Sequence, residues 1–262
     1  MEVIVVVLCI LFILYKTCRP FARRKRKRII YTSYHRKPEV FRGNVSNFQK
    51  KNCDDYGLQS EIKIKNSLIN YGIPQGAIFH NLIIKNGRGK SAQIDIVVAT
   101  KVGLIVFEIK NYAGWIFGKG KENKWTQSLK CDYRYKRYGY KKERCKTYRF
   151  YNPVLQNDFH IKALQEQSEQ FKNLPFYSVI VFDGDCELRD VSFIPKGTFV
   201  IKPHRLHDVL DIIFANAKAE YTDKREVMKI LKSAVDNGND ANVQTEHVKN
   251  VKDMLGKDRV LD

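Results

Sequence analysis

Three polar residues in one short stretch have the chemistry to hold a metal ion and a phosphate. Asp95 lies in the mostly apolar run QIDIVV, and Glu108 and Lys110 lie in a second run, FEIKNY, shortly after it. Carboxylate oxygens are preferred ligands of Mg²⁺, and a lysine can offset the charge that develops on a phosphate during substitution. The stretch therefore predicts a divalent-metal site suited to a phosphate ester.

Both runs alternate as the strands of one hairpin, with its turn at residues 100–103. This turn places Asp95 opposite Glu108, and Gln93 opposite Lys110 on the same face. The other face is wholly apolar, because it pairs Ile94 with Ile109, Ile96 with Phe107 and Val98 with Ile105. A register slipped by one residue would split both the polar and the apolar face, so the pattern argues against it.

Two carboxylates opposed on a hairpin repel one another unless a cation lies between them. We therefore expect Mg²⁺, with Mn²⁺ as the alternative, bound by Asp95, Glu108 and the carbonyl of Ile109. Lys110 would orient or activate the attacking water and offset the charge of the reacting phosphate. The alternative is a solvent-facing hairpin in which Lys110 neutralises two surface acids. The apolar character of both strands disfavours it.

The elements around the hairpin form an α/β core. A helix is expected over residues 57–71, carrying Glu61 and ended by Gly72 and Pro74. Strands are expected at 77–84, 92–100, 104–112, 177–182 and 198–201, and helices at 153–172 and 204–217. Asn152 and Pro153 are suited to begin the second helix. Residues 218–262 offer two further amphipathic helices, which we expect to be accessory.

These motifs resemble the nuclease-related domain family, a branch of the PD-(D/E)xK phosphodiesterase superfamily. The resemblance covers residues 57–217 and rests on Glu61, Asp95, Glu108 and Lys110. It extends to further family motifs, namely Gly114-Trp115, Gly118, Trp125 and the run Asn152-Pro153-Val154-Leu155-Gln156. The family often has glycine immediately before the helix glutamate, where this chain has Ser60.

The resemblance implies a restriction-endonuclease-like αβββαβ core with a mixed sheet, and Mg²⁺-dependent cleavage of nucleic acid. It implies that Glu61 is an additional acid near the metal. Gln156 would be a phosphate contact or a support for the site, and the alternative is an ordinary residue of a first helical turn. The function expected is thus hydrolysis of phosphodiester bonds, with DNA favoured over RNA. An inactive module that tethers nucleic acid to the membrane is the rival.

The charge of the chain also points to a polyanion. The formal net charge is +19 over 262 residues, which attracts nucleic acid or anionic lipid. Residues 119–151 form a basic, tyrosine-rich insertion whose cations suit phosphates and whose rings suit bases. The expected contacts are Lys130, Tyr133, Arg134, Lys136, Arg137, Tyr138, Lys141 and Lys142. The alternative is a solvated loop or a lid pressed on anionic lipid.

The amino terminus is expected to be a membrane anchor over residues 1–18. An unbroken apolar run at residues 3–15 is followed by Lys16 and Arg19, which can snorkel to the interface of a short span. Basic residues at 23–28 then place the rest of the chain in the cytoplasm. Residues 19–56 are expected to be a juxtamembrane linker. A cleaved signal peptide is disfavoured, because the basic residues follow the apolar run instead of preceding it.

Overall fold

A five-stranded mixed sheet lies at the centre of the structure. The computed structural model describes residues 45–85, 91–129, 135–136, 139–140 and 146–258. The sheet has the order β1-β2-β3-β9-β11, formed by β1 (Ile78–Lys85), β2 (Ser91–Thr100), β3 (Gly103–Asn111), β9 (Phe176–Asp183) and β11 (Thr198–Ile201). The first three strands form an antiparallel meander, and β9 is parallel to both β3 and β11. This arrangement confirms the predicted α/β class and its mixed sheet.

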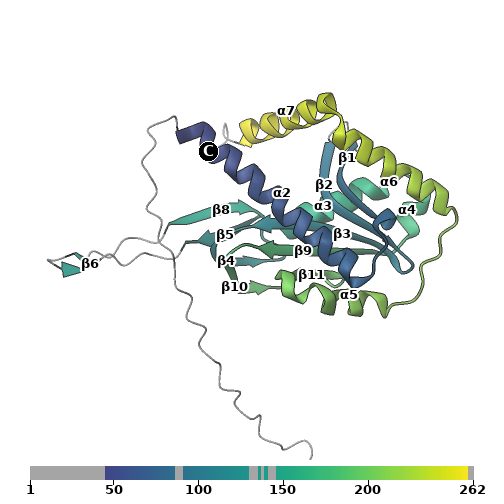
Figure 1. Ribbon diagram of the computed structural model, residues 1–262, viewed down its shortest axis with the longest axis horizontal. Coiled ribbons are helices and arrows are strands. Elements are labelled where there is room, and N and C mark those ends of the chain that lie inside the picture. The colour runs from purple at the N-terminus through teal and green to yellow at the C-terminus, as the bar shows by residue number, and fades with distance from the viewer. Residues whose placement is uncertain (1–44, 86–90, 130–134, 137–138, 141–145, 259–262) are drawn as a thin grey trace, which may run out of the picture. The chain divides into compact units, whose positions relative to one another are not determined.

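Helices cover both faces of this sheet (Figure 1). One face packs on α2 (Val45–Tyr71) and α5 (Leu206–Phe214), which bury Ile64, Leu68 and Leu210 against it. The other face packs on α3 (Pro153–Gln165), α4 (Glu169–Asn173) and α6 (Lys224–Asn239). The predicted order of helix, three strands, helix and strand is confirmed. The single helix predicted for residues 153–172 is instead two, because Ser168 caps a new helix.

The turn between β2 and β3 has the register that the sequence predicts. Thr100 pairs with Gly103, Val98 with Ile105, and Ile96 with Phe107. Gly103 has a φ of 129°, and a Cβ at this position would lie 2.2 Å from the carbonyl oxygen of Pro175. The glycine therefore allows the turn to approach the start of β9 closely.

A second sheet occupies much of the segment that was expected to be an insertion. Its order is β10-β4-β5-β8, formed by β4 (Gly114–Lys119), β5 (Lys124–Ser128), β8 (Thr147–Tyr151) and β10 (Cys186–Ser192). Trp125 of β5 is fully buried and stacks on Phe182 at 6.0 Å between ring centroids. Gly118 lies under that indole, where a Cβ would be 2.2 Å from Trp125. The ends of residues 119–151 are thus structural strands, and β6 (Tyr135–Lys136) and β7 (Gly139–Tyr140) pair between them.

The C-terminal helices extend the core. Val227, Leu231 and Ala234 of α6 are buried in the same cluster as residues of β1 and β2. α7 (Ala241–Asp258) contacts α6 and β2. Residues 218–262 were expected to be accessory, but the apolar face of α6 covers the sheet beside α3. The fold therefore needs this helix to exclude water from β1.

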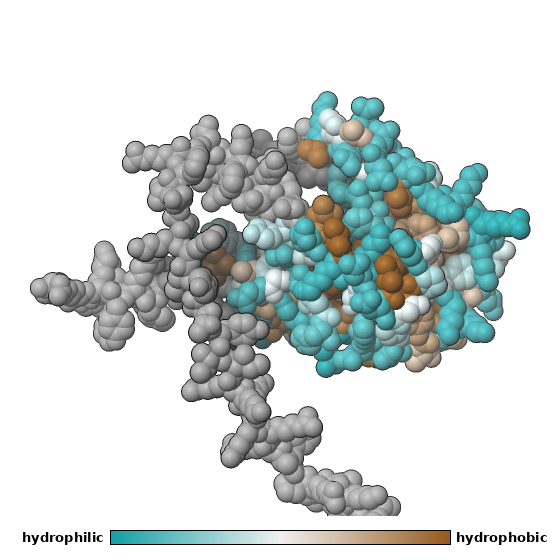
Figure 2. All heavy atoms as spheres, viewed as in Figure 1, coloured by the Kyte–Doolittle hydropathy of each residue, from teal (hydrophilic) through white to brown (hydrophobic). Residues whose placement is uncertain are grey.

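The expected anchor at residues 1–18 lies outside the described residues. Of the expected linker at 19–56, the part from Val45 belongs to α2, so the helix begins earlier than residue 57. None of the helices in the described residues is long and apolar enough to cross a membrane. Where side chains are described, the face drawn in Figure 2 is largely hydrophilic with scattered hydrophobic patches, as expected for a charged globular surface.

Candidate active site

Asp95 lies where β2 separates from β3. The ladder between these strands ends at the pair of Ile96 and Phe107, and the Asp95 carboxylate then accepts a hydrogen bond from the backbone N–H of Ile109, with Oδ2 at 2.7 Å. On the other side of β2, Asn81 of β1 and Asp95 would be partners in the ladder but do not pair, although the residues on both sides of them do. Asn81 has a φ of 56°. The side chain of Asp95 therefore takes the place of a backbone carbonyl as the acceptor for the Ile109 N–H of β3.

The predicted β2–β3 pairing is therefore wrong for the residues that precede Ile96 in β2. Ile94 packs in the cluster under α3 and α6, whereas Ile109 packs under α2, so the two do not share a face. Gln93 donates to Asn81 at 2.8 Å and does not lie beside Lys110 in the ladder. At Asn81 and Asp95 the strands β1 and β2 exchange their faces, whereas β3 keeps a regular alternation, and a uniform alternation rule cannot represent this irregularity.

The Asp95 carboxylate lies among other acids. Burial raises its pKa well above the ordinary value, and the neighbouring charges of Glu108 and Glu61 raise it further. The hydrogen bond from Ile109 and the charge of Lys110 act in the opposite direction but do not cancel the shift. The ionised form of Asp95 is therefore disfavoured in the protein alone, as expected for an acid that a cation is to neutralise.

Glu108 and Lys110 form a buried ion pair. Lys110 Nζ lies 2.5 Å from Glu108 Oε1, with side chains 20% and 2% exposed. Burial lowers the pKa of Lys110, but Glu108 and Asp95 raise it more, so the net shift is upward. The second oxygen of Glu108, Oε2, is buried and has no hydrogen bond. A buried carboxylate oxygen without a donor is costly, and its lone pairs are available to a cation.

Helix α3 supplies two further groups. Its N-cap is Asn152, whose side chain accepts from Val154 N–H, with Pro153 at the first helical position as predicted. Gln156 Oε1 accepts a hydrogen bond from Lys110 Nζ at 3.1 Å. His160 lies one helical turn later, with Nδ1 3.5 Å from Glu108 Oε2. Burial lowers the pKa of His160, although Glu108 opposes the shift.

Glu61 lies on α2 at the other side of Asp95. Its Oε2 is 2.6 Å from Nε2 of His80 on β1, and both side chains are about one quarter exposed, at 23% and 25%. The charge of Glu61 is close enough to raise the pKa of Asp95. The predicted residues Glu61, Asp95, Glu108, Lys110 and Gln156 therefore come together from two strands, β2 and β3, and two helices, α2 and α3.

The donor set suits a divalent ion held partly by substrate. Asp95 and Glu108 provide carboxylate oxygens, including the unpaired Oε2 of Glu108. Within the described residues, no group of three or more His, Cys, Asp or Glu side chains is arranged to hold a metal. Two carboxylates plus a backbone carbonyl, such as that of Ile109, leave the rest of the shell to water and phosphate, which Mg²⁺ tolerates well.

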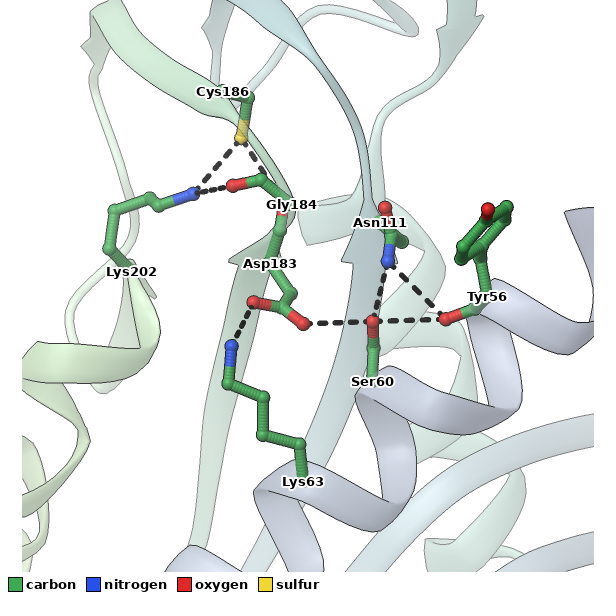
Figure 3. Close-up of polar contacts among 8 residues, drawn as sticks. All are labelled: Tyr56, Ser60, Lys63, Asn111, Asp183, Gly184, Cys186 and Lys202. Carbon is green, nitrogen blue, oxygen red and sulfur yellow. Dashed lines mark hydrogen bonds and ion pairs between the residues drawn. The ribbon is translucent and has the colours of Figure 1, made fainter. Parts of the chain in front are cut away.

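A separate polar cluster fixes α2 beside this site (Figure 3). Ser60 is 1% exposed, and its hydroxyl lies 2.9 Å from Asp183 Oδ2 and accepts from Asn111 Nδ2 at 2.8 Å. Lys63 Nζ lies 2.7 Å from Asp183 Oδ1. Ser60 therefore joins α2 to the carboxyl ends of β3 and β9. Because Glu61 is the next residue, this cluster also sets the position of Glu61.

Two histidines of the site were not predicted as site residues. His160 has a signal in the sequence, because it follows Gln156 by four residues and so lies on the same face of the helix. His80 has none, because its contact with Glu61 depends on how α2 crosses β1. Of the predicted nucleic-acid contacts at 130–142, only Lys136 lies in a described strand, β6. The other seven lie outside the described residues.

Comparisons with known proteins identify the family of this chain. The family model of the nuclease-related domain matches residues 57–183, which include Glu61, Asp95, Glu108, Lys110 and Gln156. An uncharacterized protein of Bacillus anthracis is 30% identical over 185 residues, covering 69% of this chain and 76% of that protein. No solved structure matches the chain significantly. The chain thus belongs to the nuclease-related domain family, within the PD-(D/E)xK-like nuclease superfamily.

Proposed function

We propose that the protein is a Mg²⁺-dependent nuclease that hydrolyses phosphodiester bonds of nucleic acid, with DNA favoured over RNA. The observation that carries the proposal is the meeting of Asp95, Glu108 and Lys110 where β2 leaves β3. An isolated buried lysine would neutralise one acid, but here Asp95 and Glu108 influence each other and Glu61 adds a third negative charge. This excess of carboxylate favours a cation.

Asp95, Glu108 and the Ile109 carbonyl are the groups that would hold the metal. A divalent ion at this position supplies positive charge to phosphate oxygens and lowers the pKa of an attacking water. The fit rests on the unpaired Oε2 of Glu108 and on the raised pKa of Asp95. Mn²⁺ has similar ligand preferences and is the alternative metal.

The side chains of the protein would orient the substrate and offset its charge. Lys110 is held between Glu108 and Gln156, so its ammonium is fixed before substrate arrives. A fixed cation stabilises the negative charge that develops on phosphate more effectively than a mobile one. Gln156 lies in the first turn of α3 and accepts a hydrogen bond from Lys110, which supports a role for it in the site beyond the helix itself.

A cleavage assay with the full-length protein tests this proposal. Linear, circular and single-stranded DNA and RNA would be incubated with Mg²⁺, Mn²⁺ or EDTA. We expect metal-dependent cleavage that falls about 10²-fold or more in Asp95→Asn and in Lys110→Gln. The matched control is Lys162→Gln, which removes an exposed lysine of α3 paired with Asp158. Binding without cleavage under every metal would instead favour the nucleic-acid tether.

We also propose that the protein is held at the cell membrane with the nuclease domain in the cytoplasm. The proposal rests on the apolar run at residues 3–15 and the basic residues that follow it. Deletion of residues 2–18 should move the protein from the membrane fraction to the soluble fraction. A protein that remains soluble with the segment intact would contradict the anchor without affecting the proposed chemistry.

A further inference from the structure

Asn81 of β1 has a left-handed backbone conformation opposite the expected metal ligand Asp95. The residues on both sides of the two pair in one continuous β1–β2 register, yet Asn81 and Asp95 themselves do not pair. The φ of Asn81 is 56°. Most residues other than glycine avoid this conformation, and asparagine is among those that tolerate it best. The irregularity in the sheet therefore lies at the position of the metal ligand.

The orientation of the Asp95 side chain depends on this irregularity. Ile94 packs in the cluster under α3 and α6, whereas Ile96, two residues later, packs in the cluster under α2. In a regular strand, residues two apart share a face and their side chains stand roughly perpendicular to the sheet. Such a side chain cannot reach the N–H of a neighbouring strand, which points along the plane of the sheet. The bond of 2.7 Å from Ile109 N–H to Asp95 Oδ2 therefore requires the exchange of faces.

The end of helix α6 holds Asn81 in this conformation. Helix α6 runs beside β1 (Figure 1), and its buried residue Gly238 lies against the backbone of Asn81. A Cβ on Gly238 would lie 1.7 Å from the Asn81 carbonyl oxygen, so any larger residue would push the two segments apart. The Asn81 side chain donates from Nδ2 to the Gly238 carbonyl at 2.9 Å and accepts from Gln93 Nε2 at 2.8 Å. Contacts with α6 and β2 thus fix both the backbone and the side chain of Asn81.

We propose that Asn81 and Gly238 are positioning residues for Asp95. Helix α6 docks on Asn81 through Gly238, and the docked Asn81 maintains the exchange of faces that turns the Asp95 carboxylate toward β3. The inference rests on the proposed metal-dependent nuclease function and adds to it two residues from outside the β2–β3 hairpin. Truncation of Asn81 loosens Asp95 and weakens metal binding, although every carboxylate of the site remains.

Binding of Mn²⁺ without nucleic acid tests this inference independently of turnover. The electron paramagnetic resonance signal of free Mn²⁺ would be followed during titration of the full-length wild type and its variants. Asn81→Ala should weaken Mn²⁺ binding by about 10- to 100-fold, the usual effect of losing a group that supports a metal ligand. Asn81→Gly should recover part of that affinity, because glycine adopts a positive φ without the penalty of a Cβ. The control is Asn216→Ala, which removes a side chain bonded to the carbonyls of Ile212 and Ile213 at the end of α5 and should bind Mn²⁺ as the wild type does.

Gly238→Ala tests the contribution of α6 from the other side of the contact. The added methyl group must displace the Asn81 backbone, so Mn²⁺ binding should weaken although the Asn81 side chain is intact. Gly103→Ala is the matched control, because its Cβ would lie 2.2 Å from the Pro175 carbonyl oxygen, but at the β2–β3 turn. It should lower stability without weakening Mn²⁺ binding. Urea unfolding in EDTA measures the stability of each variant.

Two results would overturn the inference. One is equal Mn²⁺ affinity in the wild type and Asn81→Ala, and the other is an equal loss of affinity in Gly238→Ala and Gly103→Ala, which would assign the loss to lower stability. If Gly238→Ala does not fold, the order of affinities among the wild type, Asn81→Gly and Asn81→Ala decides the question. A wild type that neither binds Mn²⁺ nor cleaves nucleic acid would remove the metal site together with its positioning residues. A wild type that does both, alongside an Asn81→Ala variant that does both equally well, would remove only the positioning role.

Discussion

At the scale of single residues, the site depends on polar groups that are buried with incomplete partners. Asp95 Oδ2 accepts from the backbone of β3, while Glu108 Oε2 and His160 Nδ1 have no hydrogen bond. Such groups are costly in a fold that needs only stability, so their presence indicates a function. Asp183 differs, because Lys63 and Ser60 satisfy both of its oxygens. Its role is to hold α2 in place.

His160→Ala should weaken the response of the site to metal. Its Nδ1 lies 3.5 Å from Glu108 Oε2, and loss of a group that supports a metal ligand commonly costs about 10- to 100-fold in metal affinity or activity. The half-saturating Mg²⁺ concentration for cleavage measures the effect. His204→Ala, an exposed histidine before α5, is the control. A lower unfolding midpoint with unchanged metal dependence would assign His160 to packing alone.

Asp183→Asn should remove a stabilising contribution that depends on pH. Burial opposes ionisation of Asp183, but Lys63, Ser60 and the Gly184 N–H together lower its pKa. The contribution is therefore complete above the unfolded-state value of about 3.9 and is lost as the pH falls through the folded-state pKa.

Urea unfolding of Asp183→Asn at pH 7 should show a loss of about 1.5–3 kcal/mol, the usual range for hydrogen bonds to charged groups. This difference from the wild type should shrink toward pH 3. Asp158→Asn removes an exposed partner of Lys162 and should cost less than about 1 kcal/mol at either pH. If the difference in unfolding free energy between wild type and Asp183→Asn is the same at every pH, ionisation of Asp183 does not contribute to stability.

At the scale of elements, the candidate active site forms where helices α2 and α3 pack beside the β2–β3 hairpin. The hairpin of β2 and β3 carries Asp95, Glu108 and Lys110. Helix α3 brings Gln156 and His160 to one face, and α2 brings Glu61 into contact with His80 of β1. Asn157 of α3 fixes one crossing, since its side chain donates to the Val106 carbonyl at 2.9 Å and to Ser178 at 2.8 Å. Helix α6 closes the core behind β1.

Leu231→Ala should destabilise the whole domain. Leu231 of α6 is fully buried against the central sheet, and truncation of a buried leucine to alanine typically costs about 2–5 kcal/mol. Chemical denaturation followed by circular dichroism measures this loss as one cooperative transition. Val248→Ala on α7 is the control, because Val248 is 49% exposed and should change stability by less than about 0.5 kcal/mol. A separate early transition in Leu231→Ala would show that α6 is an independent appendage.

At the scale of the whole molecule, a strongly positive chain surrounds a negatively charged site. The formal net charge of +19 attracts a polyanion over long distances, while Glu108 and Glu61 place negative charge beside Asp95. A phosphate backbone is therefore drawn to the surface but is repelled from the carboxylates until a metal neutralises them.

Binding of random-sequence DNA in EDTA should fall steeply with salt. Each phosphate contact releases counterions, and six or more contacts lower affinity by about 10³-fold or more between 50 and 200 mM salt. Fluorescence anisotropy over that range measures the slope. A fall of less than about tenfold would show that the positive charge serves another partner, and vesicles with anionic lipid are the direct comparison.

The sequence alone determined the class of fold, the order of the strands in the central sheet along the chain and the register of the β2–β3 turn. These features depend on local alternation, on Gly103 and on the N-cap Asn152, which neighbouring residues reveal. It also predicted the residues of the candidate site, because their motif was recognisable. The sequence also indicates that His160 and Gln156 lie on the same helix face, because they are four residues apart.

Only the tertiary structure decided how these residues meet. The bond from Ile109 N–H to Asp95, the contact of His80 with Glu61, and the link from Ser60 to Asp183 join segments whose separation leaves no periodic signal. The second sheet is similar, because β10 pairs in parallel with β4 from far along the chain. Contacts of this kind depend on how helices and strands pack together, and that packing is set by burial across the whole core.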